Sequence, residues 1–111
     1  MRYLMIYKTD ESAQMGPPSP EMIAEMNAFI QQMTQAGVLL STGGLLPSAT
    51  GARVRRAGDK VTVTDGPFTE AKELVGGFAI VEAQSKEEAI DQARQFLAVA
   101  GDGETEVRQM C

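Results

Sequence analysis

The fold is decided by one stretch, residues 77–97, which reads GFAIVEAQSKEEAIDQARQFL. Its beginning, 77–83, is a compact apolar run that predicts a strand. Ser85 and Glu88 follow with the spacing of a capping box, in which both side chains accept hydrogen bonds from free amides at a helix start. Apolar residues then recur at three- and four-residue intervals, at Ala89, Ile90, Ala93, Phe96 and Leu97. The stretch therefore predicts a strand that leads directly into an amphipathic helix.

The same order of strand and helix opens the chain. Residues 2–8 form a predicted strand with apolar residues on both faces, which is typical of a central strand. Ser19 and Pro20 predict a helix start, since serine caps free amides and proline gives up only a donor that lacks a partner there. The helix is predicted over about 20–36, with Gly37 as its C-terminal cap. Its apolar stripe consists of Met22, Ile23, Met26, Phe29, Ile30 and Met33, and we interpret the methionines as core filler rather than copper ligands.

Further strands are predicted at 38–40, in a hairpin of 53–56 and 60–64, and at 104–110. Gly58 and Asp59 supply the tight turn of the hairpin. Gly43 and Gly44 permit a bulge or bend after the second strand. The alternative for Ser41, Thr42, Gly43 and Gly44 is a site whose hydroxyl and amide groups donate to a carboxylate, but the spacing matches no phosphate-binding loop or dinucleotide fingerprint.

This order of elements predicts one domain over residues 1–111 with an α+β, ferredoxin-like split βαβ fold and an extra β-hairpin. Both helices are expected on one face of an antiparallel sheet. Because apolar residues populate both faces of the first strand, the other face is predicted to be covered by a second copy, in a homodimer with its sheets face to face. Tyr3 and Tyr7 share a strand face and are expected to point into the space between those sheets.

Composition narrows the function classes. The chain has 111 residues and a net charge of -5, which disfavours nucleic acid and anionic membranes as partners. It has no histidine and a single cysteine, Cys111, which excludes Ser-His and Cys-His catalysis, histidine metal sites and an intrachain disulfide. No segment is long and apolar enough to span a bilayer, and the N-terminus does not resemble a signal peptide, so a cytoplasmic location is expected.

Residues 64–73, TDGPFTEAKE, carry a family resemblance. Together with the opening 2–7 and the strand that begins Gly76-Gly77-Phe78, the motif resembles the DGPF-motif branch of the YCII-related family over essentially the whole chain. The resemblance implies a dimeric α/β barrel and an association of such proteins with sigma factors, but it names no substrate. A His-Asp pair proposed as an active site in another branch has no counterpart here, because the chain lacks histidine.

Asp65 is the candidate catalytic residue. A carboxylate at a strand end, partly desolvated by Phe68, can serve as a general acid or base near neutral pH. The alternative is structural, since aspartate accepts hydrogen bonds from amides two residues on and Gly66 with Pro67 favours a tight turn.

The candidate substrate-binding residues are Tyr7, Phe68 and Lys72. Each has a structural alternative: interface packing for Tyr7, core or interface packing for Phe68, and a solvated loop for Lys72. No cofactor and no metal site is indicated by any motif.

Two function classes remain open. The first is a cofactor-independent enzyme or ligand-binding barrel for a small acidic or aromatic metabolite, with its pocket between helix and sheet or at the dimer seam. The second is a non-catalytic dimeric regulatory or interaction module, linked to a sigma factor, whose surface is the loop 10–18 or the basic hairpin with Arg53, Arg55, Arg56 and Lys60.

Overall fold

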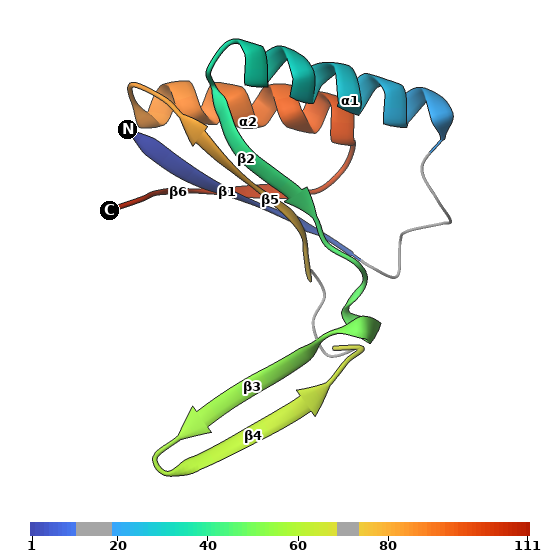
Figure 1. The fold of residues 1–111 in the computed structure, drawn as a ribbon, viewed down its shortest axis with the longest axis vertical. Coiled ribbons are helices and arrows are strands. Elements are labelled where there is room, and N and C mark those ends of the chain that lie inside the picture. The colour runs from blue at the N-terminus through green and yellow to red at the C-terminus, as the bar shows by residue number, and fades with distance from the viewer. Residues whose placement is uncertain (11–18, 69–73) are drawn as a thin grey trace.

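The computed structural model describes residues 1–10, 19–68 and 74–111 of the chain. Its elements are β1 (Arg2–Thr9), α1 (Pro20–Gln35), β2 (Leu39–Gly44), the 3-10 turn η2 (Ser48–Thr50), β3 (Ala52–Ala57), β4 (Lys60–Asp65), β5 (Leu74–Glu82), α2 (Lys86–Ala100) and β6 (Glu104–Gln109). Figure 1 shows both helices on one side of a sheet, with the β3–β4 hairpin reaching away from it.

Four strands form an antiparallel sheet in the order β2-β5-β1-β6. α1 joins β1 to β2 with β5 between them, and α2 joins β5 to β6 with β1 between them. This is a split βαβ arrangement. The predicted α+β class, with two helices packed on an antiparallel sheet, is confirmed and is compatible with a ferredoxin-like fold. The pairing of two such sheets in a dimer stays a prediction.

Both predicted helix starts are confirmed by hydrogen bonds. The Ser19 hydroxyl accepts from the Met22 amide at 3.2 Å, with Pro20 at the first helical position. The Ser85 hydroxyl accepts from the Glu88 amide at 3.2 Å. Serine therefore satisfies an otherwise free amide at the start of each helix.

The end of α1 is also as predicted. Gly37 adopts a left-handed φ of 76° and donates to the Thr34 carbonyl at 3.1 Å, while the Val38 amide donates to the Met33 carbonyl at 3.0 Å. These two bonds make a Schellman motif, which favours glycine because its φ is unfavourable for other residues. The motif turns the chain directly into β2.

The core lies between α2 and the sheet. Its buried residues are Tyr3, Met5, Val81, Ala83, Ala89 and Ala93. The small alanines of α2 let that helix pack closely, whereas α1 contributes no buried residue. The predicted orientation of Tyr3 and Tyr7 toward a second sheet is wrong, because Tyr3 lies in this core and the ring of Tyr7 contacts Phe96 of α2.

The opposite side of the sheet, which we call the open face, carries apolar residues as well. The pairing register aligns Leu4 with Ile80 and Ile6 with Phe78. These residues alternate with the core residues along each strand, so their side chains lie on the opposite face. The ring of Phe78 lies over Gly43, where an added Cβ would sit 3.0 Å from it. Neither helix covers this face (Figure 1), so its apolar centre lacks cover from the described elements.

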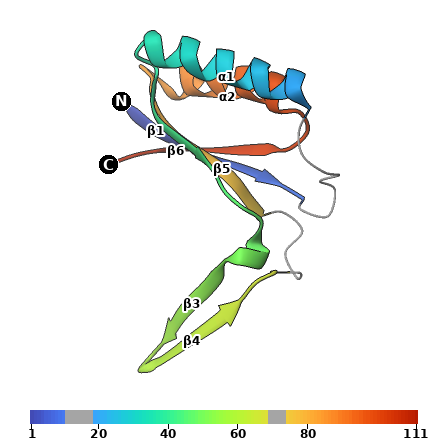
Figure 2. The ribbon, with the colours of Figure 1, turned by 45° about the vertical axis from the view of Figure 1, so that its right-hand side comes forward.

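The β3–β4 hairpin is clear of the sheet in both views (Figures 1 and 2). Its two-residue turn is formed by Gly58, with a φ of 60°, and Asp59, as predicted. Strand alternation places three valines on one hairpin face, with Val54 paired to Val63. These two side chains are 71% and 62% exposed.

A charged cluster borders the open face on β6. The Lys8 ammonium lies 3.2 Å from Glu106, and the Arg108 guanidinium lies 3.3 Å from the other oxygen of the same carboxylate. The hydrogen bonds donated by Lys8 and Arg108 lower the pKa of Glu106 from its ordinary value of 4.5. A lowered carboxylate pKa stabilises the folded state above the unfolded pKa, and that contribution is lost as the pH falls through the folded value.

We therefore expect Glu106→Gln to reduce the urea midpoint at neutral pH, with the difference from the wild type vanishing as the pH drops below 4.5. Urea unfolding across this pH range measures it. Glu25→Gln, which removes the same charge from an exposed position on α1, is the control for net charge. A difference for Glu106→Gln that persists in acid would contradict the assignment.

Candidate functional site

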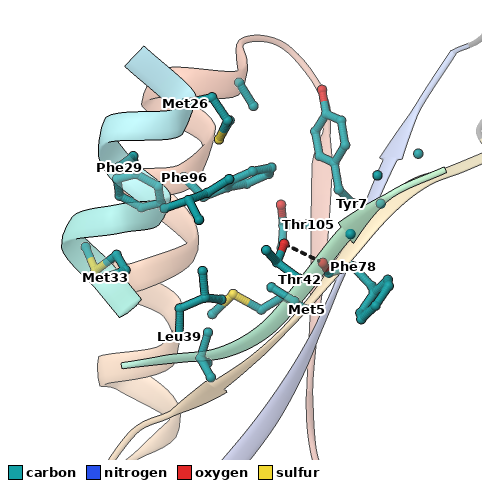
Figure 3. Close-up of a pocket in the computed structure, with 18 of the residues that line it drawn as sticks. Met5, Tyr7, Met26, Phe29, Met33, Leu39, Thr42, Phe78, Phe96 and Thr105 are labelled. Atoms are coloured by element: carbon teal, nitrogen blue, oxygen red, sulfur yellow. Dashed lines mark hydrogen bonds between the residues drawn. The ribbon is translucent and has the colours of Figure 1, made fainter. Parts of the chain in front are cut away.

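A cavity of about 760 Å³ lies between α1 and the sheet. Figure 3 shows methionine and phenylalanine side chains from the helices facing Met5, Leu39 and Thr42 of the sheet. The described lining residues are Met5, Tyr7, Thr9, Met22, Ile23, Met26, Asn27, Phe29, Ile30, Met33, Val38, Leu39, Thr42, Gly43, Gly44, Gly76, Gly77, Phe78, Ala79, Val81, Gln92, Phe96, Ala100, Asp102 and Thr105. Its volume and its mainly apolar walls are typical of small-molecule sites.

Part of the cavity floor is formed by small residues of the sheet beneath α1. Gly44 of β2 pairs with Gly77 of β5, and Thr42 pairs with Ala79 two residues along the same strands. The apolar stripe of α1, predicted to be core, therefore lines a cavity, and Met22 and Ile23 stay 37% and 47% exposed. Methionine adapts its shape to a bound molecule, so this wall suits ligands of varied outline.

Tyr7 is fixed in the cavity wall. Its hydroxyl donates to the backbone carbonyl of Asp102 at 2.9 Å. Its ring meets Phe96 edge-on, with centroids 5.3 Å apart. Gly103 passes close to the ring, where an added Cβ would sit 2.6 Å from a ring carbon. Tyr7 is therefore the sequence-predicted binding residue that lines the cavity.

Two polar side chains in the wall donate a hydrogen bond to the backbone. Thr42 donates to the Phe78 carbonyl at 2.9 Å (Figure 3), and the Gln92 amide donates to the Glu82 carbonyl at 3.3 Å. Two buried oxygens, Oε1 of Gln92 and Oγ1 of Thr105, have no hydrogen-bond partner among the described residues. A buried polar atom without a partner is costly, so these two oxygens need a partner that the described residues do not supply, such as a water or a bound molecule.

Asp65 lies elsewhere, on the hairpin. It ends β4 opposite Ala52, is exposed, and its carboxylate accepts no hydrogen bond from a described residue. The turn after it is held instead by the Gly66 amide, which donates to the Gly51 carbonyl at 2.9 Å. Asp65 is not among the described residues that line the cavity.

Phe68 sits at the base of the same hairpin. Its amide donates to the Ser48 hydroxyl at 3.1 Å, and the Arg53 guanidinium lies 4.0 Å from its ring centroid. Lys72 falls outside the described residues. The structure therefore brings Asp65 and Phe68 to the hairpin base and Tyr7 to the cavity.

Sequence reasoning missed the cavity residues Gln92 and Thr105, and it named Thr42 only within the alternative donor site at 41–44. The available signal was the pair of double glycines at 43–44 and 76–77, which we interpreted as a bend and as part of a strand. In neighbouring strands such glycines leave a floor without side chains. Among the described residues, no three His, Cys, Asp or Glu side chains are placed to share a metal ion, and neither described helix has the length and apolar character needed to cross a membrane.

The fold and the cavity define an α+β protein with a small-molecule-sized chamber between its first helix and its sheet. Comparison of the sequence with protein families matches the YCII-related domain over residues 1–110, and the chain belongs to this family. An uncharacterised protein of Rhizobium meliloti (strain 1021) is 31% identical, over 99% of this chain and 92% of the relative.

Proposed function

We propose that this protein binds a small aromatic or acidic metabolite in the cavity between α1 and the sheet. The observation that carries the proposal is the cavity itself, about 760 Å³ lined mainly by apolar side chains. Its glycine floor and methionine wall favour ligand binding over a packed core. Tyr7, fixed by Asp102 and Phe96, is the proposed orienting residue.

Binding can be tested with N-phenylnaphthylamine, a neutral dye that fluoresces in apolar surroundings. We expect saturable binding to the wild type. In Gly44→Leu the new side chain enters the cavity, since an added Cβ at Gly44 meets nothing within 4 Å. Overlap with the dye should weaken binding by about tenfold or more.

Ser41→Leu is the matched control. It adds the same side chain to the same strand, but Ser41 pairs with Ile80 and so belongs to the open face. It should leave dye affinity unchanged. Equal binding by wild type and Gly44→Leu would refute the proposed site.

A catalytic role for Asp65, with Phe68 and Lys72 as substrate contacts, is a separate part of the proposal. Its support is a carboxylate at a strand end beside an aromatic ring. Asp65 lies at the hairpin base and not among the described residues that line the cavity, so we propose that it acts on a ligand held by a neighbouring copy. The reaction would be a cofactor-independent one, such as an isomerisation or elimination.

We also propose a homodimer. The open face and the valine face of the hairpin are two uncovered apolar surfaces on one chain. A two-fold dimer lets each copy cover the other, because an isologous interface uses the same surfaces twice. The hairpin carries Arg53, Arg55, Arg56 and Lys60 on a chain of net charge -5. Association of two copies therefore also places the basic hairpin of one copy against the acidic remainder of the other.

The motif Asp65-Gly66-Pro67-Phe68 supports placing the chain in the DGPF branch of the family. With that placement goes the second candidate function, a non-catalytic regulatory module linked to a sigma factor. What favours it is the protruding basic hairpin, whose charged residues are exposed. A module of this kind would show no dye binding that depends on Gly44.

A further inference from the structure

We infer that the cavity selects a neutral, largely apolar molecule that carries an N–H or O–H donor, and that it discriminates against anions. The inference rests on the proposed function and narrows its ligand from an aromatic or acidic metabolite to a neutral, mainly apolar one. Three observations carry it: the charge of the lining, the position of α2, and the state of the polar side chains in the wall.

The part of the lining that the structure describes offers no counter-charge to an anion. Among the described lining residues there is no lysine or arginine, and Asp102 is the charged one. A carboxylate or phosphate entering this site would lose hydration without gaining a cation, which is strongly unfavourable next to apolar walls.

The helix at the cavity adds to this effect. α2 ends at Ala100, and Ala100 and Asp102 both line the cavity. The C-terminal end of a helix carries partial negative charge on its free carbonyls. Both the backbone and the nearest carboxylate therefore repel an anion from that end of the cavity.

Several polar side chains in the wall have already given a hydrogen to the backbone. Tyr7 and Thr42 each give their hydroxyl hydrogen to a backbone carbonyl at 2.9 Å. Gln92 gives an amide hydrogen to the Glu82 carbonyl, and its Oε1 has no partner among the described residues. Their remaining oxygen lone pairs can accept from a ligand N–H or O–H group, whereas Thr105, whose Oγ1 has no partner among the described residues, can accept or donate.

A matched pair of dyes tests this selectivity. N-phenylnaphthylamine is neutral and has one N–H, while anilinonaphthalene sulfonate has the same aromatic skeleton with a negative charge. We compare only the binding that Gly44→Leu abolishes, because this is the binding in the cavity. For this binding we expect the neutral dye to have a roughly tenfold or more higher affinity than the sulfonate. Fluorescence titration at one ionic strength measures both.

A charge variant completes the test. Asn27 lines the cavity from an exposed position on α1, so Asn27→Lys places a cation at the site without disturbing the core. It should tighten sulfonate binding several-fold relative to its effect on the neutral dye. Gln32→Lys, exposed on the same helix and outside the lining, should do neither.

The outcomes separate the two claims. Equal affinity for both dyes, lost in Gly44→Leu, would overturn the selectivity and leave the binding site standing. Failure of Asn27→Lys to favour the sulfonate would also overturn it. Dye binding that is indifferent to Gly44→Leu would overturn the proposed function and the selectivity together.

Discussion

Replacing Gly66 with alanine will make trypsin cut the β3–β4 hairpin about tenfold faster or more, while the four-stranded sheet stays intact. The backbone carbonyl of Ser48 occupies the place of the new Cβ, and the Ser48 carbonyl carbon would lie 2.6 Å from it. Backbone atoms cannot yield as a flexible side chain does. The chain must shift, and two hydrogen bonds at the hairpin base are then lost.

The Gly66 amide donates the first of these bonds to the Gly51 carbonyl, and the Phe68 amide donates the second to the Ser48 hydroxyl. Each bond contributes about 0.5–1.5 kcal/mol, so the loss of both increases the population of the open hairpin roughly tenfold to a hundredfold. The hairpin holds its own trypsin sites at Arg53, Arg55, Arg56 and Lys60. Cleavage is measured at one protein concentration, because the stability of a dimer depends on concentration.

Asp65→Ala is the control that separates the two interpretations of the motif. The Asp65 carboxylate accepts no hydrogen bond from a described residue, so the variant should be cut within about twofold of the wild-type rate. If Asp65 caps the turn, as one interpretation of the sequence holds, both variants would be cut equally fast. If Gly66→Ala resists trypsin like the wild type, the glycine has no structural role.

Local signals in the sequence predicted the elements well. Ser19 and Ser85 mark helix starts through their own side chains, and Gly37 marks a helix end through its own backbone conformation. The split βαβ arrangement was inferred from the order of these elements, because two amphipathic helices that join strands leave few arrangements of the sheet. Each of these inferences depends on neighbours in the sequence.

The site depends on residues that are distant in sequence, and so it was predicted only in part. Tyr7 was named as a binding residue, but its expected direction was wrong because a strand with two apolar faces does not reveal which face meets the helices. The cavity arises where Gly44 and Gly77 become neighbours, a pairing that the sequence does not state. The stripe of α1 has the same spacing whether it packs in a core or lines a cavity.

Val63→Glu will convert the proposed homodimer to a monomer, raising its dissociation constant by about a hundredfold or more. Val63 is 62% exposed in the single chain and pairs with Val54 on the valine face of the hairpin. Burying one valine contributes about 1.5–3 kcal/mol, and a two-fold interface counts each substitution twice. A buried glutamate without a partner adds a further cost. Sedimentation over a range of concentrations measures the change.

Thr62→Glu provides a control of equal charge. Thr62 is the preceding residue of β4 and pairs with Arg55, on the opposite face of the hairpin. If the valine face makes the interface, Thr62→Glu leaves the dimer intact, and Phe78→Lys on the open face reproduces the effect of Val63→Glu. If both glutamate variants dissociate the dimer equally, net charge rather than the valine face controls association. A wild-type chain that sediments as a monomer throughout would remove the dimer, and with it the route by which Asp65 reaches a neighbouring ligand.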